Sequence, residues 1–292
     1  MGKITIITPS YNRAYTLPAC YESLQAQTST DFLWLIVDDG SSDNTKDIVS
    51  KWVSGCNKFE IKYIEKPNGG KASALNMAFE LLETEYAVVL DSDDTFYPTA
   101  IESALKELEA CGKDDKCCGL MPLRHNPDGT VMGEKGELVS GSKVTMIDIL
   151  NGEYYTELVC FYKSALLKKN KFPQFPGEKF VSPQWLDFEL SRNYYFIASN
   201  SKICICEYIA DGLTRNKRKV IKKNPKGYTA VKAQSFEFSD SLKRIVKHGI
   251  MYDCGCIISR DKKWLQNSPR KIWSILIMPF ALLVYLIRFR NV

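Results

Sequence analysis

The chain has 292 residues, 45% of them hydrophobic and 25% charged, which is the composition of a globular protein with a full core in one large or two small domains. Ten cysteines without a Cys-x-x-Cys pair, and only two histidines, argue against a disulfide scaffold and a zinc site; they predict reduced, mostly buried thiols in a cytosolic protein. The net charge of +5 combines −9 over residues 1–212 with +14 from residue 213 onward, where 18 Lys and Arg face 4 Asp and Glu. The basic part predicts an anionic partner.

Strand and helix patterns alternate over the first 110 residues. Apolar, β-rich segments at 3–8, 32–37, 61–64 and 87–90 are separated by segments with apolar residues at helical spacing. This alternation predicts a mostly parallel sheet with right-handed crossovers and helices on both faces.

Three carboxylates follow directly on the apolar run at 87–90. Asp91 and Asp93 are two residues apart, so on strand geometry both point the same way, at the edge of a parallel sheet where ligands bind. Two converging carboxylates repel each other unless a cation lies between them, and Mg²⁺ or Mn²⁺ takes such oxygens together with substrate phosphates. An acidic turn that caps the next helix is the alternative.

The other strand ends should meet at the same edge of the sheet. Neither Gly-x-Gly-x-x-Gly nor a P-loop occurs, which gives no support to a dinucleotide or ATP-hydrolase site. Acids, an aromatic ring and basic residues suit a nucleoside diphosphate that is held through a metal, with its base stacked on the ring. The residues expected to gather there are Tyr11, Asp38, Asp39, Gly69, Gly70, Lys71 and residues 91–94.

Four motifs in this order resemble glycosyltransferase family 2. They are Thr8-Pro9-Ser10-Tyr11-Asn12-Arg13, Val37-Asp38-Asp39-Gly40-Ser41-Ser42-Asp43-Asn44-Thr45, Asn68-Gly69-Gly70-Lys71 and Leu90-Asp91-Ser92-Asp93-Asp94. The resemblance covers roughly the first 110 residues. It implies a GT-A fold, a nucleotide-sugar donor such as a UDP-sugar, a Mn²⁺ or Mg²⁺ cofactor, and an inverting transfer.

The resemblance also implies roles for single residues. Pro9 and Tyr11 would line the nucleoside pocket, Asp39 would accept from the base, and Lys71 would lie near the base or the phosphates. Asp93 would hold the metal. The remaining residues of the expected donor site are Arg13, Ser92 and Asp91, the last directed toward the ribose or the metal. For Tyr11, simple core packing is the alternative.

The identity of the general base in the expected reaction is undecided. In this family the base often comes from an adjacent Glu-Asp pair at the start of a helix on the acceptor side, but Pro183-Gln184 occupies that place here. Because glutamine cannot take a proton at neutral pH, the candidates are Glu178 and Asp187, with Glu189 behind them.

The C-terminal part is basic and then apolar. The run from Arg215 to Lys226 predicts either a solvated loop or a lid over the donor diphosphate. Residues 272–287 carry no charge and contain Pro279, which is expected to kink a helix. We expect this segment to lie at an anionic membrane surface, rather than to be buried or to span the bilayer. The bases expected to meet acidic lipid are Arg260, Lys262, Lys263, Arg270 and Lys271.

The sequence thus predicts an α/β chain with a GT-A catalytic domain at 1–212 and a C-terminal helical extension. The domain divides into a donor half (1–110) and an acceptor half (111–212), and the extension into a basic segment (213–268) and a membrane-associating tail (269–292).

The expected function is transfer of a sugar to an acceptor hydroxyl, on a lipid-linked glycan of a bacterial surface polysaccharide, by a protein on the inner face of the plasma membrane. The alternatives are a polyprenyl-phosphate sugar transferase, whose acceptor needs no base, and a non-catalytic nucleotide-sugar-binding protein, against which intact Asp91 and Asp93 argue. No DNA-binding pattern accompanies the basic residues, so nucleic acid is not an expected partner.

Overall fold

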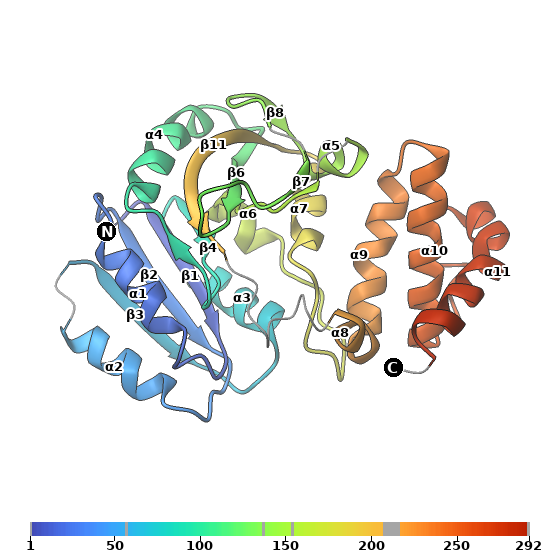
Figure 1. Cartoon of the computed structure of the whole chain (residues 1–292), viewed down its shortest axis with the longest axis horizontal. Helices are drawn as coiled ribbons and strands as arrows, with labels where there is room; N and C mark the ends of the chain where they lie inside the picture. Colours follow the sequence, from blue (N-terminus) through green and yellow to red (C-terminus); the bar gives the residue numbers. More distant parts are fainter. Residues whose placement is uncertain (1, 56–57, 136–137, 153–154, 207–216, 291–292) are drawn as a thin grey trace.

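The computed structural model describes residues 2–55, 58–135, 138–152, 155–206 and 217–290, which form an α/β body and a helical extension (Figure 1). A nine-stranded sheet in the body has the order β3-β2-β1-β4-β10-β6-β11-β5, and β8 pairs with β11 off this path. The pairings make β1, β2, β3, β4, β6 and β11 run in one direction, which confirms the predicted mostly parallel sheet.

The first half of the body is a regular strand–helix alternation. Its elements are β1 (Ile4–Ser10), α1 (Leu17–Gln25), β2 (Phe32–Asp38), α2 (Thr45–Gly55), β3 (Glu60–Glu65), α3 (Lys71–Glu80) and β4 (Tyr86–Val89). The chain moves outward from β1 to β2 and β3, and then returns to place β4 on the other side of β1. The order of the strands therefore reverses between β1 and β4, and this switch point is where open α/β sheets bind ligands.

Helices cover both faces of the sheet because each strand alternates its apolar side chains. In β1, Ile4 and Ile6 pack with α1, α2 and α4 on one face, whereas Ile7 packs with α3, α6 and α7 on the other. In β2, Trp34 and Leu35 divide between the same two clusters. Full burial of both faces explains why the strands read as unbroken apolar runs.

The second half of the body completes the sheet with mixed strand directions. Its elements are β5 (Thr95–Phe96), α4 (Ala100–Gly112), β6 (Cys117–His125), β7 (Gly133–Lys135), β8 (Lys143–Val144), α5 (Met146–Asn151), β9 (Tyr155–Thr156), β10 (Phe161–Lys163), α6 (Ser164–Lys169), α7 (Gln184–Ser191) and β11 (Tyr195–Ile205). Antiparallel β10 joins β4 to β6, so the carboxyl end of β6 lies on the same edge as the carboxyl ends of β1 and β4.

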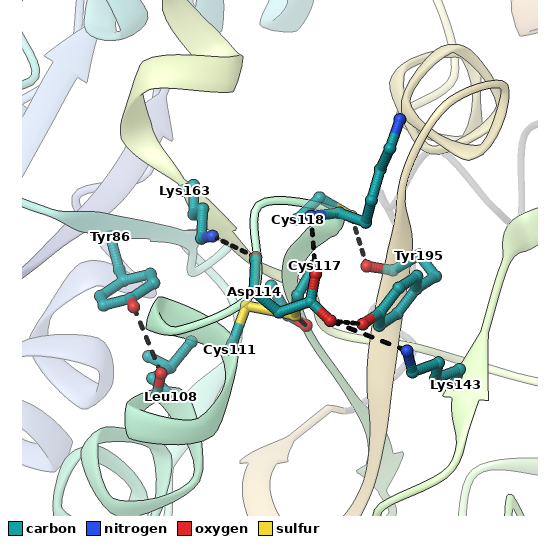
Figure 2. Close-up of a disulfide and its surroundings, with 11 residues drawn as sticks. Tyr86, Leu108, Cys111, Asp114, Cys117, Cys118, Lys143, Lys163 and Tyr195 are labelled. Carbon is teal, nitrogen blue, oxygen red and sulfur yellow. Dashed lines mark hydrogen bonds and ion pairs between the residues drawn. A yellow bond between two sulfur atoms is a disulfide. The ribbon is translucent and has the colours of Figure 1, made fainter.

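A disulfide between Cys111 and Cys117 ties the end of α4 to the start of β6 (Figure 2). The prediction of reduced thiols is therefore wrong for this pair, because a helix end and a strand start that are six residues apart in sequence meet in space. Seven further described cysteines are free and buried, as predicted, and Cys56 lies outside the described residues. Since β6 begins at this disulfide and runs with β1, the disulfide lies at the sheet edge opposite the switch point.

Around the disulfide, Asp114 holds the same corner together (Figure 2). Its carboxylate accepts a hydrogen bond from the Tyr195 hydroxyl and lies 3.7 Å from Lys143 Nζ, while Lys163 Nζ donates to its backbone carbonyl at 2.8 Å. These contacts join β8, β10 and β11 to the turn between α4 and β6.

The extension consists of α8 (Lys217–Lys223), α9 (Pro225–Phe238), α10 (Leu242–Ser259) and α11 (Lys271–Arg288). In Figure 1, α9, α10 and α11 lie side by side, with α9 next to the body. Arg192, which directly follows α7, forms a 2.7 Å ion pair with Glu237 of α9. The expected boundary at residues 212 and 213 lies outside the described residues. The expected division at residue 269 is not a packing boundary, because Ile277 of α11 shares a core cluster with Phe236 and Tyr252.

Helix α11 is continuous through Pro279 and buries only one narrow face. Ser274, Ile277 and Ala281 are buried, whereas long apolar side chains on the remaining surface are exposed. Within the described part of the chain, α11 is the one helix that is long and apolar enough to cross a membrane by length and composition, and 17% of it is buried in the protein. The exposed apolar residues of α11 are Ile272, Ile275, Leu276, Phe280, Leu282, Leu283, Leu286 and Ile287.

Candidate active site

The turn after β4 presents its side chains alternately to the crevice and to the interior. Asp91 and Asp93 are partly exposed, whereas Ser92 and Asp94 are buried, with exposed fractions of 6% and 5%. Asp91 and Asp93 thus share an accessible position, as the alternation of side chains predicts. Ser92, expected to contact the donor, offers little surface to a ligand.

Two cations flank Asp91. Lys71 Nζ, at the start of α3, lies 2.5 Å from Asp91 Oδ1, and Arg124 Nη2, at the end of β6, lies 3.7 Å from Asp91 Oδ2. Burial raises the pKa of Asp91, but the charges of Lys71 and Arg124 outweigh burial and leave that pKa below its usual value. Asp91 is therefore held ionised in the crevice.

Asp94 points away from the crevice toward a buried cluster with Cys204 and Cys206. Their ligand atoms lie close enough together to surround a metal ion. Arg124 already supplies the positive charge there, because its Nη1 donates to Asp94 Oδ2 at 2.8 Å and to Cys206 Sγ at 3.3 Å. Its Nε donates to the Leu158 carbonyl at 2.9 Å. Arg124 thus holds the acidic turn in place. Its positive charge balances the negative charge of Asp94 without a metal ion.

Asp93 differs from its neighbours because its carboxylate forms no hydrogen bond or ion pair with another described residue, although the charges of Arg13 and Lys71 act on it. Burial and the nearby charge of Asp91 raise the pKa of Asp93, which means that its negative charge is incompletely balanced. A partly exposed carboxylate with free oxygens beside a second carboxylate fits a hard divalent cation, which commonly binds through one or two carboxylates and substrate phosphates.

Asp39 organises the loop that precedes α3. Its Oδ1 accepts from Gly69 N at 2.9 Å, its Oδ2 accepts from Gly70 N at 2.6 Å, and Lys66 Nζ lies 2.6 Å from Oδ1. Asp39 is 3% exposed. The resemblance implied that Asp39 accepts from the base of the donor, but in this structure its carboxylate binds the glycine loop.

The residues after β1 face the crevice. Tyr11 is 50% exposed, so the alternative that it is a core residue is wrong, and its ring is open to stacking with a planar ligand. Asn12 has a positive φ of 53°, and its backbone N–H donates to Ser41 Oγ at 2.8 Å. Arg13 Nη1 donates to the Tyr15 hydroxyl. Pro9, which precedes this turn, is partly exposed and pairs with Val37 in the sheet.

The segment at 173–181 packs directly on the glycine loop. Gly70 has a φ of +89°, and a Cβ at this position would lie 1.8 Å from the carbonyl oxygen of Lys179, so only glycine fits. Lys179 Nζ also donates to Asn68 Oδ1 at 2.5 Å. A cavity of about 410 Å³ lies between residues 68–73 and residues 173–181. The donor half and the acceptor half thus meet at this loop.

The carboxylate of Glu178, one of the two expected bases, contacts the beginning of α9. Its Oε1 accepts from Lys226 N at 2.9 Å and its Oε2 accepts from Gly227 N at 2.8 Å. A carboxylate that binds two free N–H groups at a helix start is stabilised as the anion by those groups and by the helix dipole. This position gives Glu178 a structural role in joining the body to the extension.

Asp187, the other expected base, is 6% exposed within α7, and its Oδ1 accepts from the Tyr162 hydroxyl at 2.7 Å. Burial raises the pKa of Asp187 to about 7. Tyr162 pairs with Ala87 inside the sheet, four residues before Asp91, so the structure does not bring Asp187 to the acidic turn. Glu189, behind these two, accepts from Gln234 Nε2 at 2.6 Å.

Sequence reasoning missed two cations of the site, Lys66 and Arg124. Both lie at the carboxyl ends of parallel strands, Lys66 directly after β3 and Arg124 as the last residue but one of β6. The rule that placed Asp91 and Tyr11 at this edge also applies to these residues, once β6 is known to be parallel to β1.

Residues 5–174, more than half of the chain, match the family model described as Glycosyl transferase family 2. The chondroitin synthase of Pasteurella multocida is 36% identical over 129 residues, 44% of this chain and 13% of that protein. The poly(ribitol-phosphate) beta-N-acetylglucosaminyltransferase TarP of Staphylococcus aureus is 27% identical over 203 residues, 66% of this chain and 60% of that protein. The chain thus spans less than two thirds of the length of these curated relatives.

Two solved structures share the fold over almost the whole chain. Residues 1–349 of S. aureus TarS, in complex with UDP-GlcNAc, superimpose with a TM-score of 0.59 at 19% identity, covering 97% of this chain and 91% of that one. The mannosyltransferase PcManGT of Pyrobaculum calidifontis, in complex with GDP-Man and Mn²⁺, gives a TM-score of 0.58 at 16% identity, covering 98% and 75%. The expected fold is confirmed, and the likeness extends into the helical extension.

Proposed function

The chain belongs to glycosyl transferase family 2, and we propose that it moves a sugar from a nucleotide-sugar donor, a UDP-sugar, to an acceptor hydroxyl. The observation that carries the proposal is the convergence of an exposed aromatic ring, a lysine and two carboxylates at the switch point between β1 and β4. A nucleoside diphosphate presents a planar base and a polyanion, which match Tyr11 on one side and Lys71 with a cation on the other. The UDP-GlcNAc and GDP-Man complexes of the two similar structures support a donor of this class.

We place the metal cofactor, Mn²⁺ or Mg²⁺, on Asp93. The incompletely balanced charge of Asp93 supports this assignment, and Asp91 is already neutralised by Lys71 and Arg124. Bound there, the cation would offset negative charge that develops on the departing diphosphate. Lys71 adds a second positive charge close to the same turn.

The transfer is proposed to invert the anomeric configuration. The acceptor oxygen attacks the anomeric carbon from the face opposite the diphosphate while the bond from that carbon to the diphosphate oxygen breaks. The hydroxyl proton is released to water, and one displacement reverses the configuration. The cavity beside residues 173–181 supports an acceptor approach from that side. We propose a lipid-linked glycan of a bacterial surface polysaccharide as the acceptor, which the surface-polymer relatives support.

One observation favours a second candidate, a transferase whose acceptor is a polyprenyl phosphate. An acceptor phosphate is ionised at neutral pH and needs no general base. Glu178 binds the start of α9, and Asp187 is buried against Tyr162, so neither expected base has a carboxylate open to an acceptor hydroxyl. The two candidates share the donor site and differ in the acceptor.

We further propose that the protein binds peripherally to the inner face of the plasma membrane through α11. The exposed apolar face of this helix supports the proposal, as do the basic residues that flank it. A helix of this kind lies in the interface plane with its apolar face toward the acyl chains.

The proposed function is tested in two steps. A panel of nucleotide sugars is first screened by thermal shift with Mn²⁺, and we expect a UDP-sugar to give the largest rise in Tm. UDP release is then measured with and without a bacterial lipid extract, and we expect release to increase with lipid. Binding without release under every acceptor condition would identify a non-catalytic sugar-nucleotide protein and contradict the transferase.

A further inference from the structure

A cavity of about 700 Å³ lies between α8, α9, α10 and the end of α11, away from the crevice already described. Its lining contains no carboxylate among the described residues, and none of its cations has an ion-pair partner in the described part of the chain. The cations that line it are Lys217, Arg218, Lys219, Lys232, Lys247 and Arg288.

The positive charges in this cavity, called the cationic cavity below, are not balanced by carboxylates of the residues that the structure describes. Burial lowers the pKa of Lys232 to about 8, and the charges of Lys217 and Lys247 add to this lowering. Burial and the charges of Lys232, Lys247 and Arg244 lower the pKa of His248 to about 4. Such a concentration of unpaired cations in a hollow attracts a multivalent anion.

The exposed apolar face of α11 leads into the cationic cavity. Ile287 is 74% exposed, the next residue, Arg288, lines the cavity, and Phe289 closes its end. Leu283, one turn earlier, is 54% exposed. A cationic site at the end of an apolar helix face matches an amphiphile whose negatively charged head is held in the cavity and whose hydrocarbon chain follows the helix.

The cationic cavity is joined to the donor site by a short chain of contacts. Lys179 donates its Nζ to Asn68 Oδ1 in the glycine loop and its backbone N–H to Asn224 Oδ1 at 2.7 Å. Asn224 directly follows α8, whose lysines line the cavity. The cationic cavity and the crevice are therefore connected through Lys179 and Asn224.

We propose that the cationic cavity binds the diphosphate group of a lipid-linked acceptor, with the lipid chain along the exposed face of α11. The proposal rests on the proposed function, because it names where that acceptor's lipid end is held. A diphosphate is favoured over the single phosphodiester of a membrane phospholipid because six cations surround the cavity. One phosphodiester charge would leave most of them uncompensated.

The test measures binding of farnesyl diphosphate to the full chain by equilibrium dialysis, below the critical micelle concentration of this probe. The variant Lys217→Gln/Lys219→Gln/Lys247→Gln removes three cavity cations. The matched control, Lys243→Gln/Lys262→Gln/Lys263→Gln, removes three exposed lysines elsewhere on the extension. We expect the cavity variant to bind about 100-fold more weakly, since each lysine near such a head group contributes about fivefold, and the control to stay within about twofold.

Three further measurements separate the sources of the anion. Inorganic diphosphate should compete weakly, because it lacks the chain, and farnesol should bind equally to the cavity variant and the control. Dihexanoyl phosphatidylglycerol, a soluble single phosphodiester used below its critical micelle concentration, would assign the cavity to membrane phospholipid and overturn the proposal if it displaced farnesyl diphosphate at equal concentration. So would farnesyl diphosphate binding that is absent or insensitive to the three cavity lysines. UDP release is measured in parallel: its absence from the wild-type chain would contradict the proposed function alone, since diphosphate binding is read independently.

Discussion

Lys71 Nζ lies 2.5 Å from Asp91 Oδ1, while the neighbouring carboxylate of Asp93 has no ion-pair partner among the described residues. One motif thus contains a carboxylate that is paired with a cation and a carboxylate that is not. The two should respond differently to substitution, because only Asp93 is open to a metal ion.

The first prediction concerns Asp93. Asp93→Asn keeps the shape of the side chain and removes the proposed metal ligand, so turnover should fall by about 10²–10³-fold, the usual cost of losing one group that stabilises developing charge. Melting should be unchanged, since Asp93 is partly exposed at a strand end. The measurement is UDP release at saturating Mn²⁺, with EDTA-treated wild-type protein alongside. Full activity in EDTA would contradict metal dependence.

The second prediction separates two lysines near the crevice. Lys66 and Asp39 form a buried pair, with side-chain exposures of 8% and 5%, whereas Lys71 and Asp91 are each 22% exposed. Lys66→Met should lower the free energy of unfolding by about 3 kcal/mol, because it leaves a buried carboxylate with only backbone partners. Lys71→Met should cost about 1 kcal/mol or less and weaken UDP binding instead. Urea unfolding and UDP titration of both variants measure this contrast, and equal effects on stability would refute it.

The third prediction concerns Glu178. Because its carboxylate accepts from two N–H groups at the start of α9, Glu178→Gln should lower the free energy of unfolding by about 1 kcal/mol. Turnover should stay within a few-fold of wild type. The measurement pairs urea unfolding with UDP release on the lipid extract. If turnover instead falls by about 10²–10⁴-fold with unchanged stability and UDP affinity, Glu178 is the base and the phosphate-acceptor candidate loses its support.

The fourth prediction concerns Asp187 and pH. Burial raises its folded-state pKa to about 7, above the value of about 3.9 in an unfolded chain. Between about pH 4 and pH 7 the folded state therefore holds a proton that the unfolded state has released, and the free energy of unfolding falls as pH rises through this range. Asp187→Asn should remove this part of the pH dependence while keeping a partner for the Tyr162 hydroxyl.

The control for this prediction is Asp253→Asn. Asp253 in α10 is also buried, and burial raises its pKa to about 7, but it lies in the extension. Urea unfolding between pH 4 and 8 should show that each substitution removes its own contribution. Identical pH dependence of Asp187→Asn and wild-type protein would show that Asp187 is ionised in the fold.

The parts of the site that were predictable from sequence are those fixed by local periodicity. Asp91 and Asp93 share a direction because side chains alternate with period two, and Tyr11 follows a strand whose end was recognisable. Arg124 was not predictable in the same way, because its place beside Asp91 depends on β10 being inserted between β4 and β6.

Contacts between distant parts of the sequence account for the other differences. Glu178 is a reasonable candidate base on sequence grounds. Its two hydrogen bonds to the start of α9 come from residues 48 and 49 positions further along the chain, which no local pattern predicts. Cys111 and Cys117 lie in different elements, and no spacing rule pairs a helix end with the following strand. The run from Arg215 to Lys226 was expected as a lid or a loop, but Lys217–Lys223 of this run forms helix α8, which lines the cationic cavity.

The last prediction separates the two faces of α11. Leu276, Phe280 and Leu283 are 60%, 60% and 54% exposed, so Leu276→Gln/Phe280→Gln/Leu283→Gln should change the free energy of unfolding by less than about 1 kcal/mol. This triple variant should no longer sediment with anionic vesicles, because burial of these side chains is the proposed apolar contribution to membrane binding.

Ile277, on the buried face of α11, is 3% exposed and packs with Phe236 and Tyr252. Ile277→Ala should therefore cost about 2–4 kcal/mol of stability and retain vesicle binding at temperatures where it is folded. Substitutions test the two faces of α11 separately. Removal of the whole helix would not, because it would also expose Phe236 and Tyr252. Vesicle binding that survives in the triple variant would show that basic residues alone hold the protein at the surface, and the interfacial placement of α11 would be wrong.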